Sequence, residues 1–185
     1  MSLSEAIAAV IDFWYAPESA AAWFNPSEAF DVEVRRVLGA LYERATAGEL
    51  DRWRESAEGC LALCILLDQA PRNMFRGTPR AFGSDPQARA VATHALARGF
   101  DLLLAEDERR LFFYLPFEHS EEMVNQERGV ALCRERLADP GYLRSAERHR
   151  EIVARFGRFP HRNSVLGRSS TPEETAFLSQ PFSSF

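Results

Sequence analysis

The sequence predicts an all-α fold, and three observations support this prediction. Helix-start signals recur along the chain, apolar residues recur at helical spacing between them, and alternating polar and apolar runs are rare. The 185 residues are 46% hydrophobic and 26% charged, which is ordinary for a globular protein with a sizeable core. We therefore expect one compact domain, residues 1–185, built of antiparallel helix pairs joined by short loops.

Six expected helices have a recognisable start, because Ser, Thr and Asp side chains accept hydrogen bonds from the free N–H groups of a first turn. The expected N-terminal caps are Ser2, Ser27, Ser84, Ser120, Asp139 and Thr171. At the first and last of these, a glutamate three residues later completes a capping box. We expect the helix that begins at Ser2 to end at about Trp14 and the helix that begins at Ser120 to end at Leu137. The helices that begin at Ser27, Ser84 and Asp139 are expected to be closed by Gly48, Gly99 and Gly157.

Two further segments are assigned by their composition. Residues 57–69, AEGCLALCILLDQ, are apolar on nearly all sides, which is typical of a central helix buried by its neighbours. We expect Pro71 to begin a new short turn, because proline disrupts a helix interior. Residues 109–117, RRLFFYLPF, are the best candidate for a strand, and they fit a short helix followed by an extended link equally well.

Composition also excludes several classes of protein. A net charge of −5 and a pI near 5.5 argue against general binding to nucleic acid or to an anionic membrane. No apolar run approaches the roughly 20 residues of a membrane span, and the first residues do not resemble a signal peptide. Cys60, Cys64 and Cys133 lack metal-ligand spacing and indicate core side chains in a reducing compartment. We expect a cytoplasmic protein with no cofactor, and the sequence leaves its oligomeric state open.

Charge is distributed unevenly, and every cationic residue except histidine is an arginine. Residues 148–168 carry a net charge of +5 and residues 71–80 carry +3, whereas residues 101–122 carry −5. Buried arginines need partners, so we expect the basic segments to face acidic ones. The expected acidic partners are Asp68, Glu118 and Glu121, and the arginines that they serve are Arg72, Arg158 and Arg162.

Polar residues gather in LLDQAPRN, FEHSEEM and RFPHRN, where a proline changes the chain direction. The Arg-Asn pair that ends the first and third segments is the start of an R-N-x-x-x-G motif. The motif ends at Gly77 in the first case and at Gly167 in the second. The candidate ligand-binding residues are Asp68, Gln69, Arg72, Asn73, Glu118, His119, Glu121, Arg158, His161, Arg162 and Asn163. Guanidinium groups bind carboxylates and phosphates, so this set predicts a pocket for a small anionic ligand or an acidic chain end.

Two alternatives stay open. The protein is an enzyme, a hydrolase or transferase acting on a phosphorylated or acidic small molecule, if His119 or His161 serves as acid or base with Glu121 or Asp68 orienting it. The sequence contains no nucleophile elbow, P-loop or dinucleotide fingerprint to support this. Alternatively, the polar set is a structural ion network, and the protein binds a protein or peptide through another face.

The histidines do not indicate a metal site. Neither H-x-x-x-H nor H-E-x-x-H occurs among His94, His119, His149 and His161. His149 lies on an apolar helical stripe and is expected to be a hydrogen-bonded core histidine, whereas His94 is expected on a helix surface. No metal is expected.

Several motifs together resemble one bacterial family. They are IDFWY, WFNPSEAFD, GELDRW, LALCILLDQAPRNMFRGTPRAF, RRLFFYLPFEHSE, RHREIVARFGRFPHRNSVLGR and TPEETAFL. From about residue 7 to residue 185, the chain is similar to the family catalogued as domain of unknown function 924. The resemblance implies an all-helical, tetratricopeptide-repeat-like right-handed superhelix in one compact domain, and it implies no particular activity.

Overall fold

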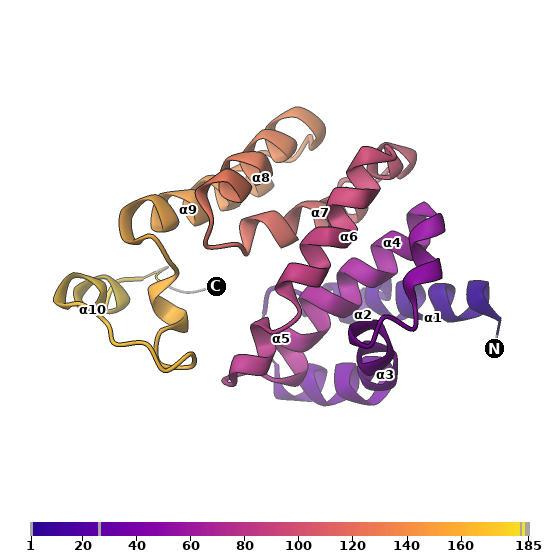
Figure 1. Cartoon of the computed structure of the whole chain (residues 1–185), viewed down its shortest axis with the longest axis horizontal. Coiled ribbons are helices and arrows are strands. Elements are labelled where there is room, and N and C mark those ends of the chain that lie inside the picture. Colours follow the sequence, from indigo (N-terminus) through magenta and orange to yellow (C-terminus); the bar gives the residue numbers. More distant parts are fainter. Residues whose placement is uncertain (1, 26, 182, 184–185) are drawn as a thin grey trace.

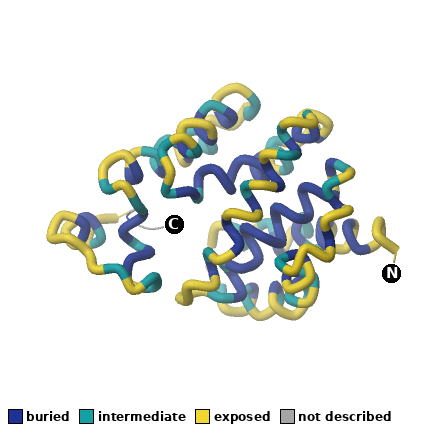
Figure 2. The backbone as a smooth tube through the Cα atoms, viewed as in Figure 1, coloured by how far each residue is buried: buried dark blue, intermediate teal, exposed yellow. Residues whose placement is uncertain are grey.

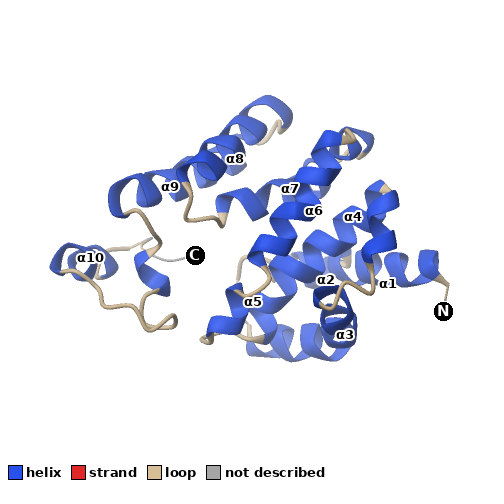
Figure 3. Cartoon of the chain, in the orientation of Figure 1, coloured by secondary structure: helices blue, strands red, loops and turns tan. Residues whose placement is uncertain are grey.

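Helices follow one another along the chain, joined by short turns (Figures 1 and 3). The computed structural model describes residues 2–25, 27–181 and 183, and no strand occurs within them. The α-helices are α1 (Leu3–Tyr15), α2 (Pro17–Ala20), α3 (Glu28–Thr46), α4 (Ala57–Cys64), α5 (Ala70–Met74), α6 (Asp85–Ala97), α7 (Asp107–Glu118), α8 (Met123–Arg136), α9 (Pro140–Phe156) and α10 (Pro172–Leu178). Short 3₁₀ turns span Asp51–Glu55, Pro79–Phe82, Phe100–Leu103 and Pro160–Arg162. The all-α prediction is confirmed, and the superhelical arrangement stays a prediction.

Four of the expected caps act as the sequence predicts. The Ser2 hydroxyl accepts a hydrogen bond from the Glu5 N–H at 3.3 Å, and the Glu5 carboxylate accepts one from the Ser2 N–H at 2.6 Å. Thr171 and Glu174 form the same capping box at α10. Side chains of Ser27 and Asp139 cap α3 and α9. Each cap acts within its own first turn, so the local sequence is sufficient to specify it.

The junction of α7 and α8 differs from the prediction. Residues 109–117 belong to one continuous helix that contains Pro116, so they include neither a strand nor an extended link. Helix α8 begins at Met123 rather than directly after Ser120. The Ser120 hydroxyl still accepts a hydrogen bond from the N–H of Glu122, at 3.2 Å, and therefore orders the chain just before the helix.

The central helical rod runs from α4 through a π-helical turn, Ile65–Gln69, into α5, so Pro71 continues the rod and does not begin a separate turn. In the π-helical turn, the Ala70 N–H donates to the Ile65 carbonyl five residues earlier. Pro71 has no N–H to donate to the Leu67 carbonyl one turn back. The hydroxyl of Ser84 donates to that carbonyl instead, at 2.6 Å, and so Ser84 does not cap α6.

The rod lies at the centre of the apolar core (Figure 2). One cluster of buried side chains includes residues of α1 and of α3 through α9. A smaller cluster, Ile152, Val153, Phe159 and Phe177, joins α9 to α10 and to the chain between them. The C-terminal segment therefore packs against the main body through few apolar contacts, and polar groups fill much of the space between them. Among the described residues, no helix combines the length and apolarity that crossing a membrane requires.

Candidate functional site

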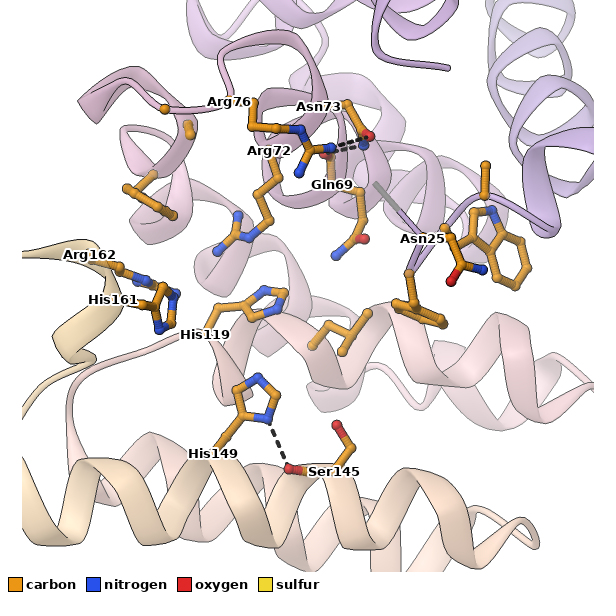
Figure 4. Close-up of a pocket in the computed structure, with 17 residues that line it drawn as sticks. Asn25, Gln69, Arg72, Asn73, Arg76, His119, Ser145, His149, His161 and Arg162 are labelled. Atoms are coloured by element: carbon orange, nitrogen blue, oxygen red, sulfur yellow. Dashed lines mark hydrogen bonds between the residues drawn. The ribbon is translucent and has the colours of Figure 1, made fainter. Parts of the chain in front are cut away.

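A cavity of about 440 Å³ lies where the central rod, the end of α7, α9 and the Pro160–Arg162 turn meet (Figure 4). Six basic side chains line it: Arg72, Arg76, His119, His149, His161 and Arg162. The described residues that line the cavity include no aspartate and no glutamate. Asp68 and Asp85, carboxylates that contact these basic groups, are not among the lining residues, and apolar side chains such as Phe24 and Leu115 complete the lining.

The structure divides the eleven predicted site residues into two groups. Gln69, Arg72, Asn73, His119, His161 and Arg162 line the cavity. Asp68 is buried behind His119, and Glu118, Glu121, Arg158 and Asn163 lie outside the lining. Sequence reasoning therefore identified the two basic faces of the cavity but extended the set too far along each motif.

His119 is held by a buried carboxylate. Its Nδ1 lies 2.8 Å from Oδ1 and 2.9 Å from Oδ2 of Asp68, which is only 1% exposed. Burial alone would raise the pKa of Asp68, but Arg72 and His119 outweigh burial and hold that pKa below its usual range. An ionised carboxylate has no proton to give, so Nδ1 of His119 carries the hydrogen. The described residues provide no hydrogen bond to Nε2.

The His119 ring is neutral near pH 7. Burial and the neighbouring Arg72 lower the pKa of His119, and this outweighs the opposing effect of Asp68. In the neutral ring with its hydrogen on Nδ1, Nε2 is a proton acceptor. Figure 4 shows the ring between Arg72 and His149. The Asp68–His119 pair is therefore a positioned base beside a cavity that has room for a small molecule.

Arg72 has two carboxylate partners: Asp68, whose Oδ1 is 3.3 Å from Nη1, was predicted, and Asp85 was not. The guanidinium makes two parallel hydrogen bonds to Asp85, at 2.8 and 3.0 Å, and donates to the backbone carbonyl of Asp68 at 2.5 Å. Asp85 begins α6, and the Ser-Asp-Pro pattern around it was interpreted only as a helix start. Arg72 therefore donates to both Asp85 oxygens, and one of them, Oδ2, also lies 3.6 Å from Nη1 of Arg162.

Arg162 has an incomplete set of partners. The residue is 6% exposed, and its nearest carboxylate oxygen, on Asp85, is 3.6 Å from Nη1. Its Nε is buried and has no hydrogen-bond partner within the part of the chain that the structure describes. The guanidinium lies 4.5 Å from the ring centre of Phe82 and 4.6 Å from that of Phe159. Burial, together with the charge of Arg72, lowers the pKa of Arg162 to about 10.

The two R-N-x-x-x-G motifs thus converge on one carboxylate. Arg72 and Arg162 both approach Asp85, although they are 90 residues apart in the sequence. Each motif ends at a glycine with a positive φ, 76° at Gly77 and 67° at Gly167, a conformation that glycine adopts without steric cost. The repeated motif marks two turns of similar geometry on opposite walls of the cavity.

Two more histidines line the cavity. His149 is buried and hydrogen-bonded through Nδ1 to the Ser145 carbonyl at 2.8 Å, as expected of a core histidine, but its ring also faces the cavity. Burial and the nearby His119 lower the pKa of His149 to about 3. Burial and Arg162 lower the pKa of His161 to about 4. These rings are therefore neutral near pH 7, and an anion beside them would favour their protonation.

Three of the predicted residues outside the lining, Arg158, Asn163 and Glu121, belong to a separate ion network. Arg158 makes hydrogen bonds of 2.7 and 2.9 Å to Glu174, and Asn163 donates to the same carboxylate at 3.2 Å. Glu121 accepts hydrogen bonds from Arg168 at 2.7 and 2.9 Å. The prediction that Asp68, Glu118 and Glu121 pair with Arg158 and Arg162 is therefore wrong. Asp85 and Glu174, which lie outside the acidic 101–122 segment, take these roles.

Several lining residues were not predicted. Arg76 lies one helical turn after Arg72 and makes hydrogen bonds of 2.7 and 2.8 Å to Asp31. The net charge of +3 over residues 71–80 was a usable signal, because Arg76 contributes to it. Trp23 and Phe24, which are not among the predicted site residues, also line the cavity. Among the described residues, no group of three or more His, Cys, Asp or Glu residues is arranged to hold a metal ion.

Comparisons with known proteins agree with this architecture. The chain matches a family described as bacterial proteins of unknown function, DUF924, over residues 10–182. It is 44% identical to a protein of unknown function from Agrobacterium tumefaciens whose structure has been solved. That match covers 96% of this chain and 99% of the other, with a TM-score of 0.89. No curated protein matches the chain. Family and fold agree along almost the whole sequence, and the chain belongs to the DUF924 family of bacterial proteins.

Proposed function

We propose that the protein binds a small anionic ligand in this cavity. One observation carries the proposal: six basic side chains line the cavity, whereas the described lining residues include no acidic one. A cavity lined in this way favours a negatively charged occupant, because the occupant gains charge-assisted hydrogen bonds and meets no like charge at the surface. A ligand of this kind can be free in solution or can be the acidic end of a chain.

Arg162 gives the proposal its energetic basis. A buried charge is costly unless it is paired and hydrogen-bonded, and the Nε of Arg162 lacks a hydrogen-bond partner among the described residues. An anion beside the Arg162 guanidinium would offset the cost of this incompletely paired buried charge. The same anion would lie near Arg72, whose own bonds to Asp85 hold it in a fixed position.

A second candidate function uses the same cavity for acid–base catalysis. The Nδ1 atom of His119 is 2.8 Å from Oδ1 of Asp68, which leaves Nε2 available to accept a proton from a bound molecule. A hydrolase or transferase acting on an acidic small molecule is the class that fits such a base. His119 is favoured over His161 for this role, because a buried carboxylate fixes its orientation and tautomer.

Thermal denaturation in the presence of phosphate, sulfate, nucleotides and simple carboxylates tests the binding function. A ligand at about 100 times its Kd should stabilise the folded protein by roughly 2.7 kcal/mol. The substitution Arg162→Gln should remove this shift, whereas Arg158→Gln, in the separate ion network, should leave it intact. If no anion stabilises the wild-type protein, or if both variants respond like wild type, the cavity is not an anion site.

A further inference from the structure

The cavity has two chemically different ends. Figure 4 shows Arg162 and His161 at one side, Asn25 at the opposite side, and His119 between them. Ala22, Trp23 and Phe24 directly precede Asn25 and also line the cavity, as does Leu115 of α7. The charged and imidazole groups therefore lie at one side of the lining, together with the Phe82 ring that contacts Arg162, and the opposite side is mainly aromatic and aliphatic. A ligand that fills the cavity meets both kinds of surface.

The volume exceeds what an inorganic anion requires. A water molecule occupies about 30 Å³ in the liquid, and pockets for drug-sized ligands usually measure about 300–1,000 Å³. The cavity, at about 440 Å³, falls within the second range. Phosphate or sulfate at the basic end would leave the remaining space to water against apolar side chains. A larger organic anion would displace that water favourably.

Trp23 presents a fixed apolar surface. Its indole Nε1 donates a hydrogen bond to the Trp14 carbonyl at 2.9 Å, so the single donor of the side chain is already used. The ring packs edge-on against Phe112, with ring centroids 4.9 Å apart. Because these contacts lock the ring, it offers hydrocarbon to the cavity and imposes little entropy cost on a ligand that packs against it.

Phe24 lies beside Trp23 and is 59% exposed. The two rings contact edge-on, with centroids 6.3 Å apart. Phe24 is a large apolar side chain in water at the lining of a cavity, and a ligand with an apolar body would bury part of its ring. This burial adds affinity that an inorganic ion cannot obtain.

Charge balance favours a monoanion. Two buried arginines, Arg72 and Arg162, are opposed by the two carboxylates of Asp68 and Asp85, so these four groups balance while the imidazoles are neutral. Arg76 is balanced separately by Asp31. Because the walls are balanced while the imidazoles are neutral, a monoanion leaves a smaller buried excess of charge than a dianion does. A phosphate dianion would leave a buried excess of negative charge, which is unfavourable.

We infer that the ligand is a small carboxylic acid with an aromatic or branched apolar body. Its carboxylate binds near Arg162 and its body packs against Trp23, Phe24 and Leu115. This inference rests on the proposed anion-binding function and adds the chemical class of the ligand. It follows from the two-ended lining, from the cavity volume and from the charge balance of the surrounding groups.

Calorimetric titration with four probes tests the inference: acetate, 3-phenylpropanoate, 3-phenylpropan-1-ol and phenyl phosphate. We expect 3-phenylpropanoate to bind at least tenfold more tightly than acetate, since each buried methylene group adds about a fourfold gain in affinity. We also expect 3-phenylpropanoate to bind more tightly than 3-phenylpropan-1-ol, which has no charge, and more tightly than phenyl phosphate, whose dianion has one negative charge more. Proton release or uptake is measured in the same titrations by changing the buffer.

Matched variants locate the two ends. Phe24→Ala should weaken 3-phenylpropanoate several-fold and leave acetate unchanged, whereas Leu102→Ala, at an apolar site elsewhere with a similar exposure of 56%, should change neither. Arg162→Gln should weaken both acids, and Arg158→Gln should weaken neither. Circular dichroism and thermal denaturation of each variant establish that it is folded before its affinity is compared.

The possible outcomes separate the inference from the proposed function. Equal affinity for acetate and 3-phenylpropanoate would refute the inference that the ligand has an apolar body and would leave anion binding intact. Tighter binding of phenyl phosphate would refute the inference that the anionic group of the ligand is a carboxylate. Equal binding of the alcohol and the acid would overturn recognition of charge, and with it the proposed function. Absence of binding by all four probes would overturn both.

Discussion

Glu118 provides the sharpest test of the electrostatics beside the cavity. The carboxyl group is 1% exposed, its Oε1 accepts a long hydrogen bond of 3.4 Å from Cys133, and its Oε2 has no hydrogen-bond partner among the described residues. His149 Nδ1 lies 3.8 Å from Oε2, close enough for an ion pair. Burial disfavours charge on both groups, however, and the His149 nitrogen already donates to the Ser145 carbonyl. We therefore expect a neutral carboxylic acid.

The effect of Glu118 on the free energy of unfolding follows from its pKa shift. Burial, and to a lesser extent the negative charge of Asp68, raise the pKa of Glu118 to about 8. Above the unfolded pKa near 4.5, the native state then binds more protons than the unfolded state, so the carboxyl group increasingly destabilises the protein as pH rises. The destabilisation at pH 7 corresponds to the roughly 2.5 pH units between the unfolded pKa and pH 7, which is roughly 3 kcal/mol at 1.36 kcal/mol per unit. Below pH 4.5 it is nearly absent.

Glu118→Gln removes the titration and keeps the shape of the side chain. We expect the variant to be more stable than wild type by about 3 kcal/mol at pH 7, and the gain to shrink toward zero at pH 4. Urea denaturation at pH 4, 5, 6 and 7 measures the difference, and Glu127→Gln, at an exposed position in α8, is the control. If Glu118→Gln is instead less stable at pH 7, Glu118 is ionised and paired with protonated His149, and the reasoning fails.

Two further predictions concern the rod and the ligand. Ser84→Ala leaves the Leu67 carbonyl without a partner and should lower the free energy of unfolding by about 1–3 kcal/mol in urea denaturation, whereas an unchanged stability would show that Pro71 needs no such compensation. Anion affinity should rise as pH falls, because a bound anion raises the lowered pKa of His119 and so favours its protonated form. The charged and titratable groups around His119 are Arg72 and Asp68 of the rod, Asp85 of α6 and His149 of α9. The gain should approach tenfold per pH unit between the free and bound pKa values, and affinity that is constant from pH 7.5 to 5.5 would contradict it.

Helix starts could be predicted from the sequence because a cap acts within one turn. Ser2 and Thr171 meet their glutamates three residues away, and no distant contact is needed to form either box. Pro71 shows the limit of local reasoning. Its effect on the rod depends on the Ser84 hydroxyl, which lies 17 residues from the carbonyl that it serves. A rule that considers only neighbouring residues predicts a break at this position.

The sequence predicted which basic residues lie together, and of the predicted ion pairs the structure contains Arg72 with Asp68. The basic segments indicated where cationic groups would gather, and Arg72, His119 and Arg162 do line one cavity. The net charge of a segment predicts the sign of the charge on its partner but not which residue that partner is, so Asp85 and Glu174 were missed. His149 was missed for another reason: helical periodicity marks the inward face of a helix but does not distinguish a filled core from a cavity.

The shared contact of Arg72 and Arg162 with Asp85 has a consequence for local unfolding. Bringing the second motif to the first closes a chain segment of 90 residues, and the entropy cost of closure rises with the logarithm of that length. Helices α1–α7 are joined by an extensive apolar core, whereas α10 is held by a small apolar cluster and ion pairs. Local undocking of α10 therefore breaks fewer apolar contacts than unfolding of the core does, and a molecule in contact with both Arg72 and Arg162 would oppose separation of the two motifs.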